Sequence, residues 1–127
     1  MTSRLSTYRI GSPRNSKAEL RIGTVRLPPR GVPKRDYARR GLFDVWLPLM
    51  APSRELLKAF HAGNKSPSQF FRAYRAEMQQ PAARHTIELL AAISRHTPIA
   101  VGCYCEDETR CHRSVLIELI RTAAKQQ

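Results

Sequence analysis

Residues 98–114 read PIAVGCYCEDETRCHRS and join a short apolar run to a helical C-terminal tail. The run from Pro98 to Tyr104 has the length of a strand, and its continuous apolar character is typical of a strand buried on both faces. The tail predicts a helix from about Arg110 to Ala124. Its inward face consists of Val115, Leu116, Leu119, Ile120 and Ala123. A strand buried on both faces beside an amphipathic helix favours a sheet covered by helices.

The chain before this stretch supplies the other elements of such a domain. Alternating, β-branched segments predict strands at Ser6–Gly11, Leu20–Leu27 and Asp44–Leu47. Three helices should follow: one capped by Ser53 and ending near Gly63, one capped by Ser66 with Pro67 in its first turn, and one from Pro81 to about His96. We therefore expect an α/β fold, with a short mixed sheet packed with helices, in a single domain over residues 1–127.

Length and composition agree with one soluble domain. The 127 residues are 42% hydrophobic, which is enough for a single core. No run of about 18 apolar residues is present to cross a membrane. The N-terminus, MTSRLSTYRI, lacks the apolar segment of a secretory signal. We therefore expect a cytoplasmic protein without membrane contact.

Positive charge is concentrated in the first third of the chain. Residues 1–40 hold eleven Lys or Arg against two acids, a net charge of +9, whereas the remaining 87 residues carry +3 of the total +12. The segment PPRGVPK (28–34) is a stiff loop that presents Arg30 and Lys34. Such a field attracts phosphates on nucleic acid, on nucleotides or on an anionic membrane. The alternatives are a solvated cationic surface without a partner and an ordinary connecting loop.

The three cysteines lie within nine positions, Cys103, Cys105 and Cys111. An odd number in a reducing cytosol favours free thiols over a disulfide framework. Cys111 and His112 fall at the start of the last helix, where unpaired N–H groups and the helix dipole favour a thiolate. Ligands of open α/β sheets also bind at the carboxyl ends of strands. Cys111 is therefore the best candidate for a reactive thiol, although the neighbouring carboxylates of residues 106–108 act against a thiolate.

Two other interpretations of the cysteines remain open. Cys103, Cys105, Cys111 and His112 are ligand types that zinc prefers, but C-x-C followed by C-H lacks the usual paired spacing. Cys105 and Cys111 could instead form a redox pair, since a strand end and the next helix start can approach to disulfide distance. A further alternative is structural: Cys103 is a small buried hydrophobe, and Cys111 fills space on a helix face.

Several motifs, in order, resemble the YeaO-like family catalogued as domain of unknown function 488, and the likeness extends over almost the whole chain. They are RIGTVRLPPRGVPK from Arg21, DVWLP from Asp44, APSRELLKAF from Ala51, FFRAYRAEM from Phe70 and CYCEDETRCHRS from Cys103. The resemblance implies an α/β fold with no established activity.

The chain matches the family pattern at some positions of the Arg-Gly segment and of the cysteine segment and departs from it at others. Val25–Arg26 and Pro29–Gly31 match the G-x-R and W-P-R-G segments, but Pro28 replaces a usual Trp and Thr24 does not supply a usual acid. Many relatives carry a Cys-Glu pair and then Cys-His-Arg, which correspond to Cys105, Glu106 and residues 111–113. Other branches lack these cysteines, so the chemistry that they support is not common to the whole family.

Our leading hypothesis is a small cysteine-dependent enzyme or sensor that acts on a phosphorylated or nucleotide-like anion. The expected reactive residues are Cys111 as the thiol, His112 as a proton carrier, Glu106 as an acid or base, and Cys105. The expected anion-binding residues are Arg26, Arg30, Lys34 and Arg113. One alternative is a basic nucleic-acid-binding module with structural cysteines, and another is a zinc or iron site. The sequence indicates no particular cofactor.

Overall fold

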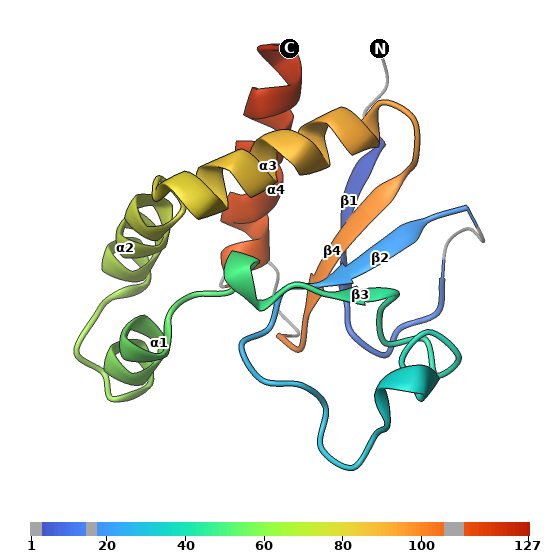
Figure 1. Cartoon of the computed structure of the whole chain (residues 1–127). Helices are drawn as coiled ribbons and strands as arrows, with labels where there is room; N and C mark the ends of the chain where they lie inside the picture. The colour runs from blue at the N-terminus through green and yellow to red at the C-terminus, as the bar shows by residue number, and fades with distance from the viewer. Residues whose placement is uncertain (1–3, 15–17, 106–110) are drawn as a thin grey trace.

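The computed structural model describes residues 4–14, 18–105 and 111–127. In chain order its elements are β1 (Leu5–Arg9), β2 (Leu20–Gly23), β3 (Val45–Trp46), α1 (Arg54–His61), α2 (Pro67–Glu77), α3 (Pro81–Ser94), β4 (Ile99–Cys103) and α4 (His112–Lys125). Short 3₁₀ turns occupy Lys34–Asp36 and Pro48–Met50. The predicted α/β class is therefore confirmed (Figure 1).

The four strands form one sheet in the order β1-β4-β2-β3. All strand pairs among the described residues are parallel, so the expectation of a mixed sheet was wrong. Strand β4 lies between β1 and β2, which are consecutive in the chain but do not pair as a hairpin. Every residue of β4 is buried, as its apolar sequence predicted.

Side chains alternate along β4 between two apolar layers. Ile99 and Val101 point into the larger layer, which the helices complete, whereas Ala100 points into a smaller one with Tyr8 and Phe43. Figure 1 shows the helices gathered to one side of the strands, while the long segment between β2 and β3 extends away from them. Cys103 is in phase with Ile99 and Val101 and therefore belongs to the helix-facing side of the sheet.

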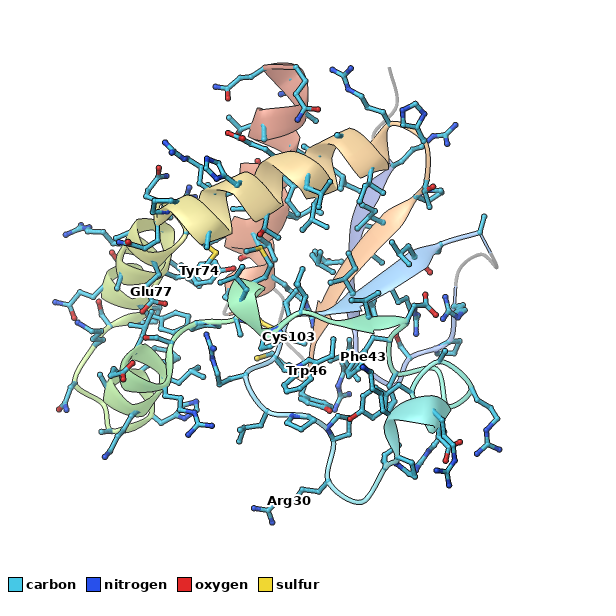
Figure 2. All side chains as sticks on the ribbon, viewed as in Figure 1. Arg30, Phe43, Trp46, Tyr74, Glu77 and Cys103 are labelled. Carbon is cyan, nitrogen blue, oxygen red and sulfur yellow. A yellow bond between two sulfur atoms is a disulfide. The ribbon has the colours of Figure 1, made fainter. Side chains whose placement is uncertain are left out.

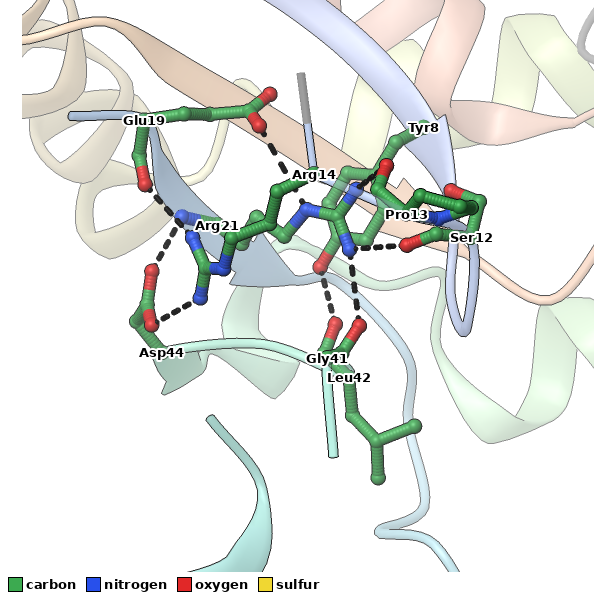
Figure 3. A network of polar contacts seen from close by, with 9 residues as sticks. All are labelled: Tyr8, Ser12, Pro13, Arg14, Glu19, Arg21, Gly41, Leu42 and Asp44. Atoms are coloured by element: carbon green, nitrogen blue, oxygen red, sulfur yellow. Dashed lines mark hydrogen bonds and ion pairs between the residues drawn. The ribbon is translucent and has the colours of Figure 1, made fainter. Parts of the chain in front are cut away.

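A buried arginine fastens the long β2–β3 segment to the sheet. Arg21 is 1% exposed, and its guanidinium donates to the carbonyl oxygens of Ser12 (2.6 Å), Pro13 (2.7 Å) and Gly41 (2.9 Å) (Figure 3). The same group lies 4.1 Å from the ring centroid of Tyr8. Its Nε is 3.7 Å from a carboxylate oxygen of Glu19, which is also buried. The positive charge of Arg21 therefore interacts with groups inside the molecule and is not presented at the surface.

No helix within the described ranges is long and apolar enough to cross a membrane. The longest, α3 and α4, have 14 residues each, and both pack against the sheet and each other. Their apolar faces are therefore accounted for by the core.

Candidate functional site: a buried cysteine–histidine cluster

Two cysteines meet where β4 ends and α4 begins. Cys103 is the last residue of β4 and is 2% exposed, while Cys111 is the N-cap of α4 and is 1% exposed. The structure joins their sulphur atoms as a disulfide, with the Cα atoms 7.8 Å apart (Figure 2). That Cα separation is larger than the range of about 4.4–6.8 Å in which most disulfides form. Cys105 is exposed and free, so the pair is Cys103–Cys111 and not the Cys105–Cys111 pair considered as an alternative. The expectation of free thiols therefore holds only for Cys105.

His112 is held between this pair and the end of β2. Its Nε2 lies 2.7 Å from the carbonyl oxygen of Thr24 and 3.1 Å from the hydroxyl of the same residue. Because a carbonyl oxygen can only accept, Nε2 carries the proton. The lone pair of Nδ1 is then directed to Cys111, whose Sγ is 3.6 Å away. The Thr24 carbonyl thus fixes the tautomer of His112.

The environment of His112 keeps its imidazole neutral. Burial lowers the pKa of His112 to about 4, the hydrogen bond to Thr24 opposes this, and the positive charge of Arg113 lowers the pKa further. The ring also contacts the edge of Tyr74, with the centroids 5.3 Å apart. At neutral pH the Nδ1 lone pair is therefore available to a proton or to a metal ion.

Thr24 is a member of the cluster that sequence reasoning missed. It is 0% exposed, and both its backbone N–H and its hydroxyl donate to the carbonyl oxygen of Gly102, each over 2.9 Å. The sequence pattern placed Thr24 inside a strand that runs to Leu27, but β2 ends at Gly23. No local sequence signal marks Thr24, because it reaches the cluster through the pairing of β2 with β4, whose carboxyl ends share one edge.

Arg113 lies under the cluster and not on its surface. The side chain is 4% exposed, and Nη1 donates to the carbonyl oxygens of Tyr8 (3.0 Å) and Cys103 (3.3 Å). The same nitrogen lies 3.4 Å from the sulphur of Cys103. Within the described part of the chain, the Nε of Arg113 has no hydrogen-bond partner. A fixed cation beside Cys103 favours the thiolate form of that residue when the pair is reduced.

Comparison with known proteins assigns the family. A family model described as the active DUF488-N3 subclade matches residues 5–124. The chain belongs to the DUF488 family. The uncharacterized protein YeaO of Escherichia coli (strain K12) is 33% identical over 116 residues, which cover 90% of this chain and 94% of that protein. No solved structure matches. The resemblance to YeaO-like proteins is therefore confirmed, and the names of these relatives specify no reaction.

The expected anion-binding residues of this DUF488 protein are dispersed. Arg26 donates to the carbonyl oxygens of Pro52 (3.2 Å) and Ala51 (3.1 Å), so it fastens the segment before α1. Arg30 and Lys34 are exposed in the β2–β3 segment, and Figure 2 shows Arg30 pointing away from Cys103. Arg30 and Lys34 therefore do not form one anion site with the cysteines in this arrangement. Of the four predicted residues, only Arg113 lies at the cysteines.

The four-ligand metal set that was one alternative for the DUF488 protein is not complete in the structure. Ligand atoms of Cys103, Cys111 and His112 all lie within 4.8 Å of one another, and all three residues are buried. Cys105, in contrast, is exposed. Glu106, the expected acid or base, lies outside the described residues.

Proposed function

We propose that the protein is a cysteine-dependent enzyme or sensor whose reactive group is Cys111 in the reduced state. The observation that carries this proposal is the Nδ1 of His112, 3.6 Å from the Cys111 sulphur, on a ring whose other nitrogen is fixed by Thr24. A nucleophile, a base and a group that orients the base are the three parts of an activated thiol site. The description of the subclade as active supports a chemical role for the protein.

In the reduced pair, the neutral Nδ1 of His112 accepts the proton of the Cys111 thiol as that thiol attacks a substrate, because the low pKa of His112 keeps its ring neutral at rest. The resulting imidazolium keeps its Nε2–H bond to the Thr24 carbonyl, and the thiolate lies at the N-cap of α4. The unpaired N–H groups and the dipole of this helix end stabilise negative charge, and the buried cation of Arg113 acts in the same direction. These contributions offset the cost of placing a charge in a buried position.

Cys103 gives the site a second, redox state. When the pair is a disulfide, Cys111 has no free thiolate and the nucleophile is masked. An external dithiol restores it: one of its thiolates attacks a sulphur of the pair, the other expels the protein thiol, and two electrons pass to the pair. Sensing and catalysis are therefore two uses of one centre, distinguished by whether the pair turns over with a substrate.

The ligand that suits this centre is a small anion that carries an electrophilic atom, such as a phosphorylated or nucleotide-like compound. The N-terminus of α4 provides donors for an anion, and Arg113 keeps one guanidinium nitrogen without a partner among the described residues. Arg30 and Lys34 are not needed for this arrangement, because their exposed loop contributes only to long-range attraction.

Alkylation of reduced protein with iodoacetamide as a function of pH tests the proposal. The Cys105→Ser variant removes the exposed thiol, and a chelator keeps the sample free of metal. Cys111 should then react with an apparent pKa below the ordinary value of about 8.5. His112→Gln in the same background should move the profile upward, while the Cys103/Cys105→Ser double variant assigns the signal to Cys111. A Cys111 that titrates like a free thiol, with or without His112, would refute the nucleophile.

A second candidate function, binding to the nucleic-acid backbone, is favoured by the charge of the β2–β3 segment. Its exposed cations are Arg30, Lys34, Arg35, Arg39 and Arg40. Several phosphate contacts would make the affinity fall steeply with salt. The Arg30→Ala/Lys34→Ala variant should weaken binding and reduce that salt dependence, whereas Lys125→Ala, an exposed cation at the end of α4, should leave both unchanged. Affinity that does not depend on salt would exclude this function.

A further inference from the structure

The cluster also has the composition and geometry of a metal site. We propose that, in the reduced protein, Cys103, Cys111 and Nδ1 of His112 bind a thiophilic divalent ion of the Zn²⁺ class. The three ligand atoms lie within 4.8 Å of one another, and none of the three residues is more than 7% exposed. Two thiolates and a neutral imidazole are the ligands that such ions prefer, and the proposal goes beyond thiol reactivity.

The distance between Cys111 and His112 fits a shared ion, although the two residues are adjacent in the chain. With Zn–S of about 2.3 Å and Zn–N of about 2.0 Å, a tetrahedral angle places sulphur and nitrogen about 3.5 Å apart. The observed separation of Cys111 Sγ and His112 Nδ1 is 3.6 Å. Adjacent residues reach one centre here because Cys111 precedes the helix in an extended conformation and His112 opens it.

The backbone around the two cysteines also leaves room for an ion. Their Cα atoms are 7.8 Å apart, beyond the usual range for a disulfide of about 4.4–6.8 Å. A metal ion between two thiolates holds the sulphur atoms farther apart than a direct bond does, so it suits the wider separation. Reduction of the pair therefore gives a backbone that is already spaced for a bridging ion.

Two residues that would not bind the ion themselves, Thr24 and Arg113, contact the ligands and hold them in place. The Nε2–H of His112 donates to the Thr24 carbonyl, which is the common way in which proteins orient a metal-binding histidine. Arg113 Nη1 lies 3.4 Å from the Cys103 sulphur and can donate to it as a thiolate. Three protein ligands leave a fourth position for water or an exogenous anion, which is the pattern of open rather than purely structural zinc sites.

Ion binding would also regulate the reactivity of Cys111, and this consequence rests on the proposed function. The binding of the ion does not depend on the proposed function. A bound ion occupies the Cys111 thiolate and the Nδ1 lone pair, so it suppresses alkylation. Oxidation by a small-molecule disulfide removes two electrons from the two thiolates, forms the Cys103–Cys111 bond and releases the ion. The site would therefore alternate between a reduced, metal-bound form and an oxidised, metal-free form.

Titration of the reduced protein with Zn²⁺ and Co²⁺ tests the proposal. We expect one ion per chain and a sulphur-to-cobalt charge-transfer band of the strength of two thiolates. Cys103→Ser and Cys111→Ser should each lose stoichiometric binding, and Arg113→Met should weaken it about 10–100-fold. Cys105→Ser is the matched control, because it removes an exposed thiol near the cluster, and it should bind as the unmodified protein does.

A measurement without substitutions guards against variants that fail to fold. In the unmodified reduced protein, Zn²⁺ should protect Cys103 and Cys111 from iodoacetamide and leave Cys105 reactive. Less than stoichiometric metal, a cobalt spectrum without the sulphur band, or protection of Cys105 alone would overturn the proposal. Rapid alkylation of Cys111 in the metal-free protein would still support the proposed function, so failure of the two ideas can be told apart.

Discussion

At the scale of single residues, the most consequential side chain outside the cysteine cluster is Arg21. It donates to three carbonyl oxygens that come from the β1–β2 connection and from the β2–β3 segment. Its other close partners are the Tyr8 ring and the buried carboxylate of Glu19. Because removal of one member of a buried ion pair leaves a desolvated charge behind, Arg21 should be essential to stability.

We therefore expect Arg21→Met to lower the free energy of unfolding by about 3–5 kcal/mol. Arg39 is the matched control: it pairs with Asp36 over 2.8 Å, but its side chain is 74% exposed. Arg39→Met should cost no more than about 1 kcal/mol, because exposed ion pairs contribute little. Urea denaturation of both variants measures the difference. Equal costs would mean that burial does not determine the contribution of these arginines.

Local sequence signals predicted only part of the residues of the cluster. Cys111, His112 and Arg113 were expected together because all three begin one helix. The choice between Cys103 and Cys105 depended on where β4 ends, and apolar character does not determine the last residue of a strand. Since β4 ends at Cys103, that side chain stays inside while Cys105 is exposed. Thr24 reaches the cluster through the pairing of distant strands, for which no local signal exists.

At the scale of elements, Ser53 connects two helices. Its hydroxyl accepts from the N–H of Leu56 over 3.1 Å, which caps α1, and donates to the carboxylate of Glu77, the last residue of α2. The backbone N–H of Ser53 donates to the other oxygen of that carboxylate over 2.9 Å. Ser66, in contrast, contacts only its own helix. Its hydroxyl accepts from the N–H of Gln69, and the Gln69 side chain accepts from the N–H of Ser66.

Replacing each cap by alanine should separate these roles. Ser66→Ala should lower the free energy of unfolding by about 1 kcal/mol, the usual cost of an N-cap. Ser53→Ala should cost about 2–3 kcal/mol, since it also removes a hydrogen bond to a charged group. Urea denaturation provides both values. If the two variants lost the same stability, the Ser53–Glu77 contact would contribute nothing beyond the cap.

The helices were predicted more accurately than the sheet for a physical reason. Ser53, Ser66, Pro67 and Pro81 mark helix starts through interactions within one turn, and the structure begins α1, α2 and α3 beside these residues. Strand order depends on β4 entering between β1 and β2, although it follows β2 by about 75 residues and β1 by about 90 in the chain. No local pattern reports such an insertion, so the parallel sheet could not be derived from periodicity.

At the scale of the whole molecule, several of the many cations in the sequence are held by contacts within the protein. Arg14 pairs with Asp44 over 2.5 Å, while Arg21 and Arg26 donate to backbone carbonyls. Arg30, Lys34, Arg35 and Arg40 remain exposed, while Arg39 pairs with Asp36, and all of them lie in the segment that extends away from the helices. Residues 30–40 hold five of the 22 Lys and Arg against one acid, so this one loop carries +4 of the net charge of +12.

The protein as a whole should lose stability in strongly alkaline solution because two of its tyrosines are buried. Burial is the main cause that raises the pKa of both Tyr8 and Tyr74 far above the ordinary value of 10. Their hydroxyls donate to the carbonyl oxygens of Leu42 (2.7 Å) and Met50 (2.6 Å), which a phenolate cannot do. Above pH 10 the unfolded chain releases phenolic protons that the folded protein retains, so stability is complete below that pH and falls as pH rises.

Each of the two tyrosines should contribute up to about 1.4 kcal/mol per pH unit to this loss. Tyr74→Phe should therefore roughly halve the steepness between about pH 10.5 and 12, although loss of the bond to Met50 lowers stability at neutral pH as well. Urea denaturation at several pH values gives the slope of the free energy of unfolding against pH. This slope reports the titration alone, because the lost hydrogen bond lowers stability by the same amount at every pH. Spectrophotometric titration should show two phenols ionising only on unfolding. A slope that Tyr74→Phe leaves unchanged would show that Tyr74 ionises as readily in the folded protein as in the unfolded chain.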